Sequence, residues 1–141
     1  MSFGRTNANV ALLADYIEQN PDEDIEVTVV AGGQLITGKL ITEDAFFALD
    51  DNLGLQLNFN KHIRDERNRI IDQINDGNTT EELPDYLSED FLYLKNAAYI
   101  LGEINFFGHK EDGLSIQVRI SDVSAFSYRG LNPDLSTWQK L

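Results

Sequence analysis

Histidine and cysteine, the side chains that most often bind metals or act as nucleophiles and bases, are almost absent from this sequence. There is no cysteine, so thiolate zinc sites, cysteine nucleophiles and disulfides are excluded. The two histidines, His62 and His109, lie outside any HExxH or His-x-His spacing that would bring two imidazoles to one metal ion. Both are therefore interpreted as surface residues.

Acidic side chains are the second candidate chemistry, because paired carboxylates can bind divalent cations or transfer protons. Examples are Asp22-Glu23-Asp24, Asp50-Asp51, Glu81-Glu82 and Glu89-Asp90. None has the alternating oxygen spacing of an EF-hand loop, and no catalytic partner accompanies them. The sequence therefore predicts no catalytic residue, no metal, no cofactor and no small-molecule substrate. An enzyme that uses acidic residues with a divalent metal stays as a rival hypothesis.

The glycines do not form a phosphate-binding loop. Gly32 and Gly33, with Gly38 shortly after them, lie between two strand-like segments and open no helix. No helix N-terminus is therefore offered there to a phosphate group. Two consecutive glycines suit the positive φ angles of a tight hairpin, and the sequence predicts a hairpin at this place.

The net charge argues against nucleic acid and anionic lipid as partners. The chain has 24 acidic and 11 basic residues, which gives −13 at pH 7. Such a charge repels phosphate backbones at long range. The densest basic group is Lys61, Arg64, Arg67 and Arg69, and acidic residues are interleaved with it. This group is interpreted as the solvated face of a charged helix.

Length and composition are those of one globular domain. The chain has 141 residues, of which 42% are hydrophobic, so we expect a single domain over residues 1–141 with its own core. Residues 1–6 have no apolar signal-peptide region, and no apolar run approaches the ~18 residues of a membrane span. These features favour a cytoplasmic protein without a membrane partner.

Hydrophobic periodicity predicts a mostly β, α+β fold. Val10 and Ile17 belong to one helical stripe, and apolar and polar residues alternate in the predicted strands. Gly38 and Asn96 mark expected irregularities in two strands. The expected elements are a helix at 7–19, strands near 25–30, 35–41, 90–101, 114–120 and 123–129, a helical insertion at about 43–76 that begins with a short helix at 45–51, and an acidic loop at 77–88.

Phe106 and Phe107 differ from the other aromatic residues, most of which are expected in the core. They adjoin a glycine turn, where neighbouring aromatic side chains would be exposed in a loop. Exposed apolar side chains mark contacts with partners. Phe106 and Phe107 are therefore the predicted protein-binding residues.

Several apolar stretches carry a family likeness. These are residues 29–41, Val-Val-Ala-Gly-Gly-Gln-Leu-Ile-Thr-Gly-Lys-Leu-Ile, then residues 46–49, and later residues 91–96 and 118–126. In order and spacing they resemble the gas vesicle accessory protein family GvpU over most of the chain. The resemblance implies a non-enzymatic, cytoplasmic protein-interaction module. It would associate with the gas vesicle shell or with other accessory proteins and act in vesicle assembly or clustering.

A second likeness concerns the fold. The first signature of Sm-like proteins is similar to a pattern in this sequence: Gly33 and Gly38 on a predicted hairpin, followed by Asp44 and Phe46. Residues 118–123 have the register of the second signature of that family. This resemblance implies a small, strongly bent five-stranded barrel of the Sm-like or SH3-like kind, with an N-terminal helix. The helical insertion would be an addition to that barrel.

The Sm-like likeness also supplies an alternative function, a ring-forming nucleic-acid-binding protein with an altered pocket. Ala48 stands where that family has a base-binding asparagine, and Ile120 replaces the glycine that follows the signature arginine. The nucleic-acid contacts in this alternative would be Arg119 and Lys39.

A bent sheet that is not closed leaves edge strands that can pair with another chain. The predicted edges are the strand at 123–129 and the strand that opens at Phe91. The sequence therefore favours a homo-oligomer.

Overall fold

The chain forms two compact units, one made of Met1–Phe46 with Asp90–Leu141 and one of Phe47–Glu89. The computed structural model describes residues 7–77, 82–84, 87, 90–101, 105–107 and 113–130, with only the backbone of residues 101 and 105–107. The first unit contains an antiparallel sheet and a helix, and the second is helical. The fold class is therefore α+β.

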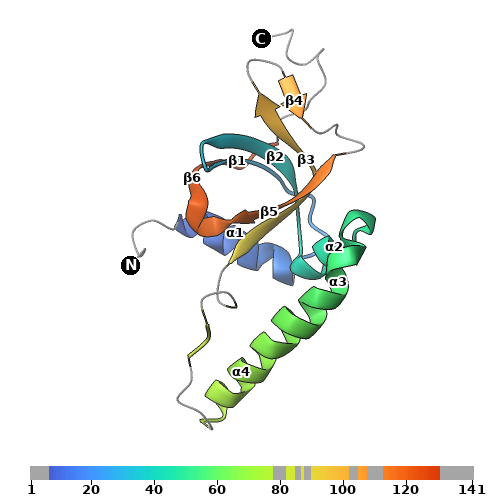
Figure 1. Ribbon diagram of the computed structural model, residues 1–141. Coiled ribbons are helices and arrows are strands. Elements are labelled where there is room, and N and C mark those ends of the chain that lie inside the picture. Colours follow the sequence, from blue (N-terminus) through green and yellow to red (C-terminus); the bar gives the residue numbers. More distant parts are fainter. Residues whose placement is uncertain are drawn as a thin grey trace. The chain divides into compact units, whose positions relative to one another are not determined.

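The sheet begins with a hairpin between β1 (Glu26–Ala31) and β2 (Gln34–Ile41), drawn in Figure 1. The two residues between these strands, Gly32 and Gly33, have φ angles of 60° and 78°. A two-residue turn with two positive φ angles matches the right-handed twist of the strands, and glycine adopts it without steric cost. The predicted glycine hairpin is confirmed.

The long strand β3 (Phe91–Leu101) lies inside the sheet. It pairs with β2 on one side, and with β4 (Asn105–Phe107) and β5 (Leu114–Arg119) on the other. The prediction that the strand opening at Phe91 forms an edge is therefore wrong, because other strands occupy both of its sides.

The pair β2–β3 is irregular at Gly38 and Asn96. The register shifts between Thr37 and Lys39, and Asn96 has a φ angle of 49°. A Cβ atom on Gly38 would lie 2.9 Å from the Cβ of Ala97, so the lack of a side chain lets the two strands approach. The irregularities expected at these two residues are confirmed, and such bulges bend a strand.

Strands β5 and β6 (Val123–Ser127) are joined by only the three-residue 3-10 turn η4 (Ile120–Asp122), so the sheet must curl to bring them together (Figure 1). These two strands pair at opposite sides of the sheet, β5 with β3 and β6 with β1. Within the described residues they do not pair with each other, so the sheet is not closed. It has six strands, in the order β4-β3-β2-β1-β6 with β5 beside β3, where five were expected.

Helix α1 (Ala8–Gln19) contributes to the core of the first unit. It begins at Asn7, whose side-chain oxygen accepts the backbone N–H of Asn9 at 2.9 Å. Burial of an aliphatic side chain stabilises the fold by about 1.5–3 kcal/mol before the entropy cost of ordering it. The buried cluster consists of Val10, Ile17, Ile25, Val27, Val29, Ile36, Leu40, Leu92, Leu94, Ala97, Val118, Ile120 and Val123.

The start of α2 (Glu43–Ala48) is held by side chains of the first unit. The Thr42 hydroxyl accepts a backbone N–H of the first turn at 3.1 Å, and the carboxylate of Glu18 accepts the Glu43 N–H at 2.7 Å. These acceptors satisfy donors that a helix N-terminus leaves unpaired. The Glu43 carboxylate in turn accepts the Tyr93 hydroxyl at 3.0 Å.

The helical insertion differs in detail from the prediction. The insertion begins at residue 43 as predicted, but the short helix expected at 45–51 has the wrong end, because α2 ends at Ala48. The acidic loop expected at 77–88 falls largely outside the described residues. After α2 the insertion consists of the 3-10 turn η2 (Asp50–Asn52), α3 (Leu53–Asn58), the π-helical turn η3 (Phe59–Arg64) and α4 (Asp65–Asn75).

Candidate functional site

The two basic residues of the nucleic-acid alternative, Lys39 and Arg119, lie on different strands. Lys39 lies on β2 at the level of Lys95, whereas Arg119 ends β5 at the level of Phe91, on the other side of β3. Each lies beside a carboxylate. The Nζ of Lys39 is 3.3 Å from Asp24, and Nη1 of Arg119 is 3.5 Å from Asp122.

Phe106 and Phe107, the predicted protein-binding residues, have only their backbone described. They belong to β4, where Phe106 pairs with Ile100 and Phe107 with Tyr99. Their side chains lie outside the described part of the chain, so the contact stays a prediction.

The described residues contain no cluster of three or more histidine, aspartate or glutamate side chains that could hold a metal ion. His62 is exposed on η3, and His109 lies outside the described residues. No helix in the described part of the chain is long and apolar enough to cross a membrane.

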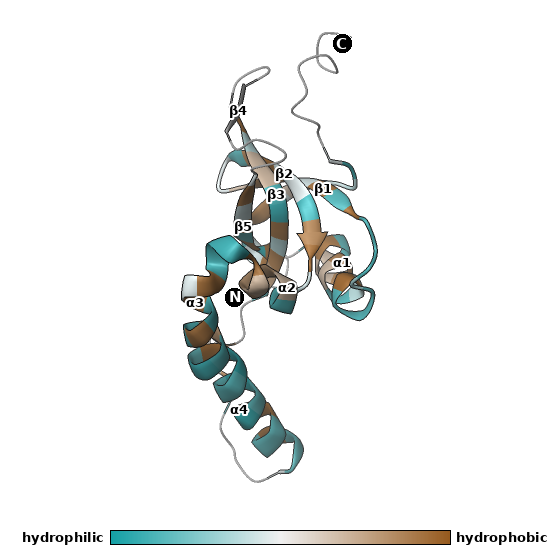
Figure 2. Cartoon of the chain, turned by 90° about the vertical axis from the view of Figure 1, so that its right-hand side faces the viewer, coloured by the Kyte–Doolittle hydropathy of each residue, from teal (hydrophilic) through white to brown (hydrophobic). Residues whose placement is uncertain are grey.

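Three leucines at the start of the long helical run are exposed to solvent. Leu53, Leu55 and Leu57 of α3 keep 51%, 53% and 73% of their surface accessible. Figure 2 shows apolar colour on α3, next to the mostly hydrophilic α4. We call these three side chains the leucine cluster. Single exposed leucines are normal on proteins, whereas Leu53 and Leu57, four residues apart, share one side of the helix and form a small apolar patch.

The sequence contains a signal for this cluster. Residues 53–58 read Leu-Gly-Leu-Gln-Leu-Asn, an alternation with the period of a strand. In a helix, residues two apart do not share a face, so the alternating leucines cannot all be buried against one neighbour. A strand-like alternation that folds as a helix therefore leaves apolar side chains exposed.

Aromatic stacking anchors this run within the helical unit. The rings of Phe47 and Phe59 lie parallel, with an angle of 9° and centroids 3.9 Å apart. The guanidinium carbon of Arg64 lies 5.6 Å from the centroid of the Phe59 ring, within the range of a cation–π contact. Phe59 is the first residue of the π-helical turn, a feature often found at functional sites.

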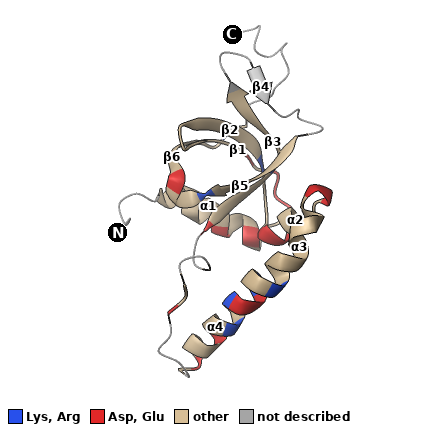
Figure 3. Cartoon of the chain, viewed as in Figure 1, with Lys and Arg blue, Asp and Glu red and all other residues tan. Residues whose placement is uncertain are grey.

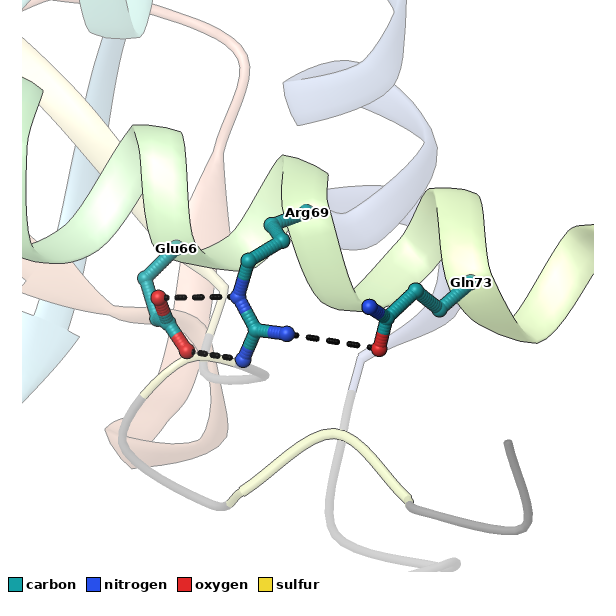
Figure 4. Close-up of polar contacts among 3 residues, drawn as sticks. All are labelled: Glu66, Arg69 and Gln73. Carbon is teal, nitrogen blue, oxygen red and sulfur yellow. Dashed lines mark hydrogen bonds and ion pairs between the residues drawn. The ribbon is translucent and has the colours of Figure 1, made fainter. Parts of the chain in front are cut away.

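Polar contacts along α4 stabilise its exposed face. Arg69 donates through Nε to the Glu66 carboxylate at 3.2 Å and through Nη1 to the Gln73 side chain at 3.3 Å (Figure 4). The guanidinium of Arg69 holds the pKa of Glu66 below its usual value. Such contacts three and four residues apart stabilise a helix, and they lie on the charged face that the sequence analysis interpreted as solvated.

A second exposed apolar surface lies on the sheet unit. Leu12 and Tyr16, four residues apart on α1, are 66% and 43% exposed, and Tyr128 is 64% exposed. The Tyr16 hydroxyl donates to Glu23 at 3.3 Å. The charge of Glu23 is the main cause that raises the pKa of Tyr16. We call Leu12, Asp15 and Tyr16 the α1 face.

These surfaces are suited to binding other macromolecules. Comparison with known families found one match, to a family model described as gas vesicle protein GvpU-like, over residues 8–131. No curated protein and no solved structure matches the chain. The match spans both units and most of the sequence. The chain belongs to the GvpU-like family of gas vesicle proteins.

Proposed function

We propose that the protein is a non-enzymatic accessory protein that binds gas vesicles through protein–protein contacts in the cytoplasm and promotes their assembly or clustering. The family match over residues 8–131 carries this proposal, since the family is a gas vesicle family and not an enzyme family. The partner would be the vesicle shell or another accessory protein.

The exposed apolar side chains support a binding role. The leucine cluster on α3 and the α1 face each offer leucine or tyrosine side chains to a partner, and tyrosine is enriched at protein interfaces. Phe106 and Phe107 remain proposed contact residues in the same role. The net charge of −13 favours protein partners over nucleic acid.

The curled sheet supports a finer proposal for the architecture. We infer that β1, β2, β3, β5 and β6 correspond to the five strands of a bent Sm-like or SH3-like barrel, to which β4 is an addition. The three-residue connection between β5 and β6 supports this, because it joins the two sides of the sheet. β5 and β6 each pair with one described strand, so their outer sides are the proposed edges for homo-oligomer formation.

Co-flotation tests the proposed function. Purified protein is mixed with isolated gas vesicles, the vesicles are floated by centrifugation, and bound protein and light scattering are measured at several salt concentrations. We expect the protein to rise with the vesicles and the scattering to increase. Protein that stays in the liquid below the vesicles at every salt concentration would contradict the proposed vesicle binding.

Variants locate the contact in the same experiment. Phe106→Ala and Phe107→Ala should each lower the fraction that floats if these residues bind the shell. Phe126→Ala is not a useful control, because Phe126 packs against the core. Ile74→Gln serves instead, since Ile74 is a partly exposed apolar residue near the end of α4, in the other compact unit.

A further inference from the structure

The α1 face lies in the part of the chain with the most one-sided charge. Residues 8–38 contain six acidic residues and no basic one, and Figure 3 shows acidic residues on α1 but both signs along α4. The strands beside β1 add two basic residues. These are Lys39 on β2, whose Nζ lies 3.3 Å from Asp24, and Arg129 just after β6. Acidic side chains therefore outnumber basic ones around this helix.

The leucine cluster has both signs of charge next to it. The exposed Asp50 and Asp51 come directly before Leu53, and the exposed Lys61 follows about one turn after Leu57. The two exposed apolar surfaces therefore differ, and the α1 face is the one with a clear electrostatic preference.

The α1 face is an outer stripe of the helix that packing against the sheet does not use. Leu12 and Tyr16, four residues apart, share one side of α1 and are 66% and 43% exposed, and the exposed Asp15 lies beside them. The buried Val10 and Ile17 lie on the opposite side and belong to the core. The stripe is thus available to a partner without any change in the core.

The chemistry of this stripe favours a cation next to an apolar group. An exposed tyrosine ring such as that of Tyr16 attracts lysine or arginine through a cation–π contact. The Tyr16 hydroxyl donates to the Glu23 carboxylate at 3.3 Å, so a negative charge lies at the edge of the ring. The charge of Glu23 raises the pKa of Tyr16, as a negative potential does. Leu12 supplies an apolar contact one turn away.

We propose that the α1 face binds a basic amphipathic helix of a partner protein. A lysine or arginine of that helix stacks on Tyr16 and pairs with Asp15 or Glu23, and an apolar side chain of the same helix packs on Leu12. Leu12 and Tyr16 are one turn apart, the spacing into which the side-chain ridges of a second helix pack. The inference rests on the proposed function only for the partner's identity, the vesicle shell or another accessory protein, and adds that partner's charge and shape.

Charge selects among the possible occupants of the face. Nucleic acid and anionic lipid carry the same sign as the face and are repelled. A basic helix gains the apolar contact together with opposite charges, which also speed its association. The few side chains involved fall short of the roughly 800 Å² per partner of a stable interface. We therefore expect a dissociation constant on the order of 10 μM.

Binding is tested with a synthetic amphipathic helix of leucine and lysine that carries a fluorescent label. It is titrated with the purified full chain, and fluorescence anisotropy is measured. Leu12→Gln and Asp15→Lys should each weaken binding about tenfold. Leu57→Gln and Asp51→Lys on α3 are the matched controls and should change the affinity less than about twofold, because they alter the same kinds of exposed side chain at another place. Circular dichroism checks that all four variants fold.

Changes to the peptide test the chemistry of the partner. A peptide with glutamate in place of lysine should not bind, and one with serine in place of leucine should bind at least about tenfold more weakly. With the leucine–lysine peptide, the backbone NMR signals of residues 8–24 should shift more than those of residues 53–75. High salt should weaken binding only in part, because salt screens the charges and leaves the apolar contact.

Two results would overturn the contact: equal effects of the α1 and α3 variants on peptide affinity, or the largest NMR shifts outside residues 8–24. A third concerns another occupant. If Leu12→Gln lowers self-association in sedimentation velocity but leaves peptide affinity unchanged, a second copy occupies the face and the proposal fails.

The outcome is separable from that of co-flotation. A protein that binds the peptide at α1 and does not float with vesicles refutes the vesicle role alone. A protein that floats equally well with Leu12→Gln and with Asp15→Lys, and binds no peptide, refutes the basic-helix contact alone.

Discussion

A methyl group at position 38 should destabilise the sheet, because β2 and β3 approach most closely there. In Gly38→Ala the new Cβ would lie 2.9 Å from the Cβ of Ala97, 3.1 Å from the Cβ of Leu94 and 3.2 Å from the Cα of Ala97. Two of these neighbours are Cβ atoms attached to the backbone and the third is backbone itself. No flexible side-chain end can move aside, so the strands must separate or the bulge must change.

The expected magnitude follows from two opposing effects. Overpacking in a core costs about 1–3 kcal/mol. Replacement of glycine by alanine lowers the entropy of the unfolded chain and returns about 0.4–1 kcal/mol. Gly38→Ala should therefore lower the free energy of unfolding by about 1–2 kcal/mol, measured by urea denaturation and followed by far-UV circular dichroism.

Two further variants make the measurement specific. Ala97→Gly removes the nearest atom, so in the double variant Gly38→Ala/Ala97→Gly the loss should be smaller than the sum of the single losses by about 1 kcal/mol. Gly54→Ala is the control, because nothing lies within 4 Å of its Cβ position in α3, and alanine should stabilise that helix by about 0.5–1 kcal/mol. Full stability of Gly38→Ala, with no coupling to position 97, would refute the close approach of the strands.

Three other changes test local polar contacts. The Thr28 hydroxyl lies 2.7 Å from the carbonyl oxygen of Arg129, so Thr28→Val should cost about 1–3 kcal/mol in urea denaturation, whereas Thr28→Ser should keep most of that contact. Glu23→Gln removes the main cause of the raised pKa of Tyr16, so the pKa should fall toward 10.0 in an NMR titration, and an unchanged pKa would contradict the assigned contact. Asn7→Ala should cost about 1 kcal/mol through loss of the α1 cap, and Asn7→Asp should not.

Local chemistry explains which parts of the fold the sequence predicted. The hairpin at Gly32 and Gly33 and the first helix depend on neighbouring residues alone, so periodicity and turn chemistry identify them. The irregularity at Asn96 was also visible, because asparagine tolerates positive φ. The position of β3 inside the sheet was not, because pairing with β5 depends on a strand distant in the sequence.

The ion pairs of the candidate site also differ in whether their partners are near in the sequence. Lys39 and Arg119 are visible as basic residues in the sequence, but Asp24 approaches Lys39 only through the fold of the hairpin region. Asp122, three residues after Arg119, could have been noticed as a local partner. The exposure of Leu57 was not predicted, because its alternating segment forms no single apolar stripe that would distinguish a buried face from an exposed one in a helix.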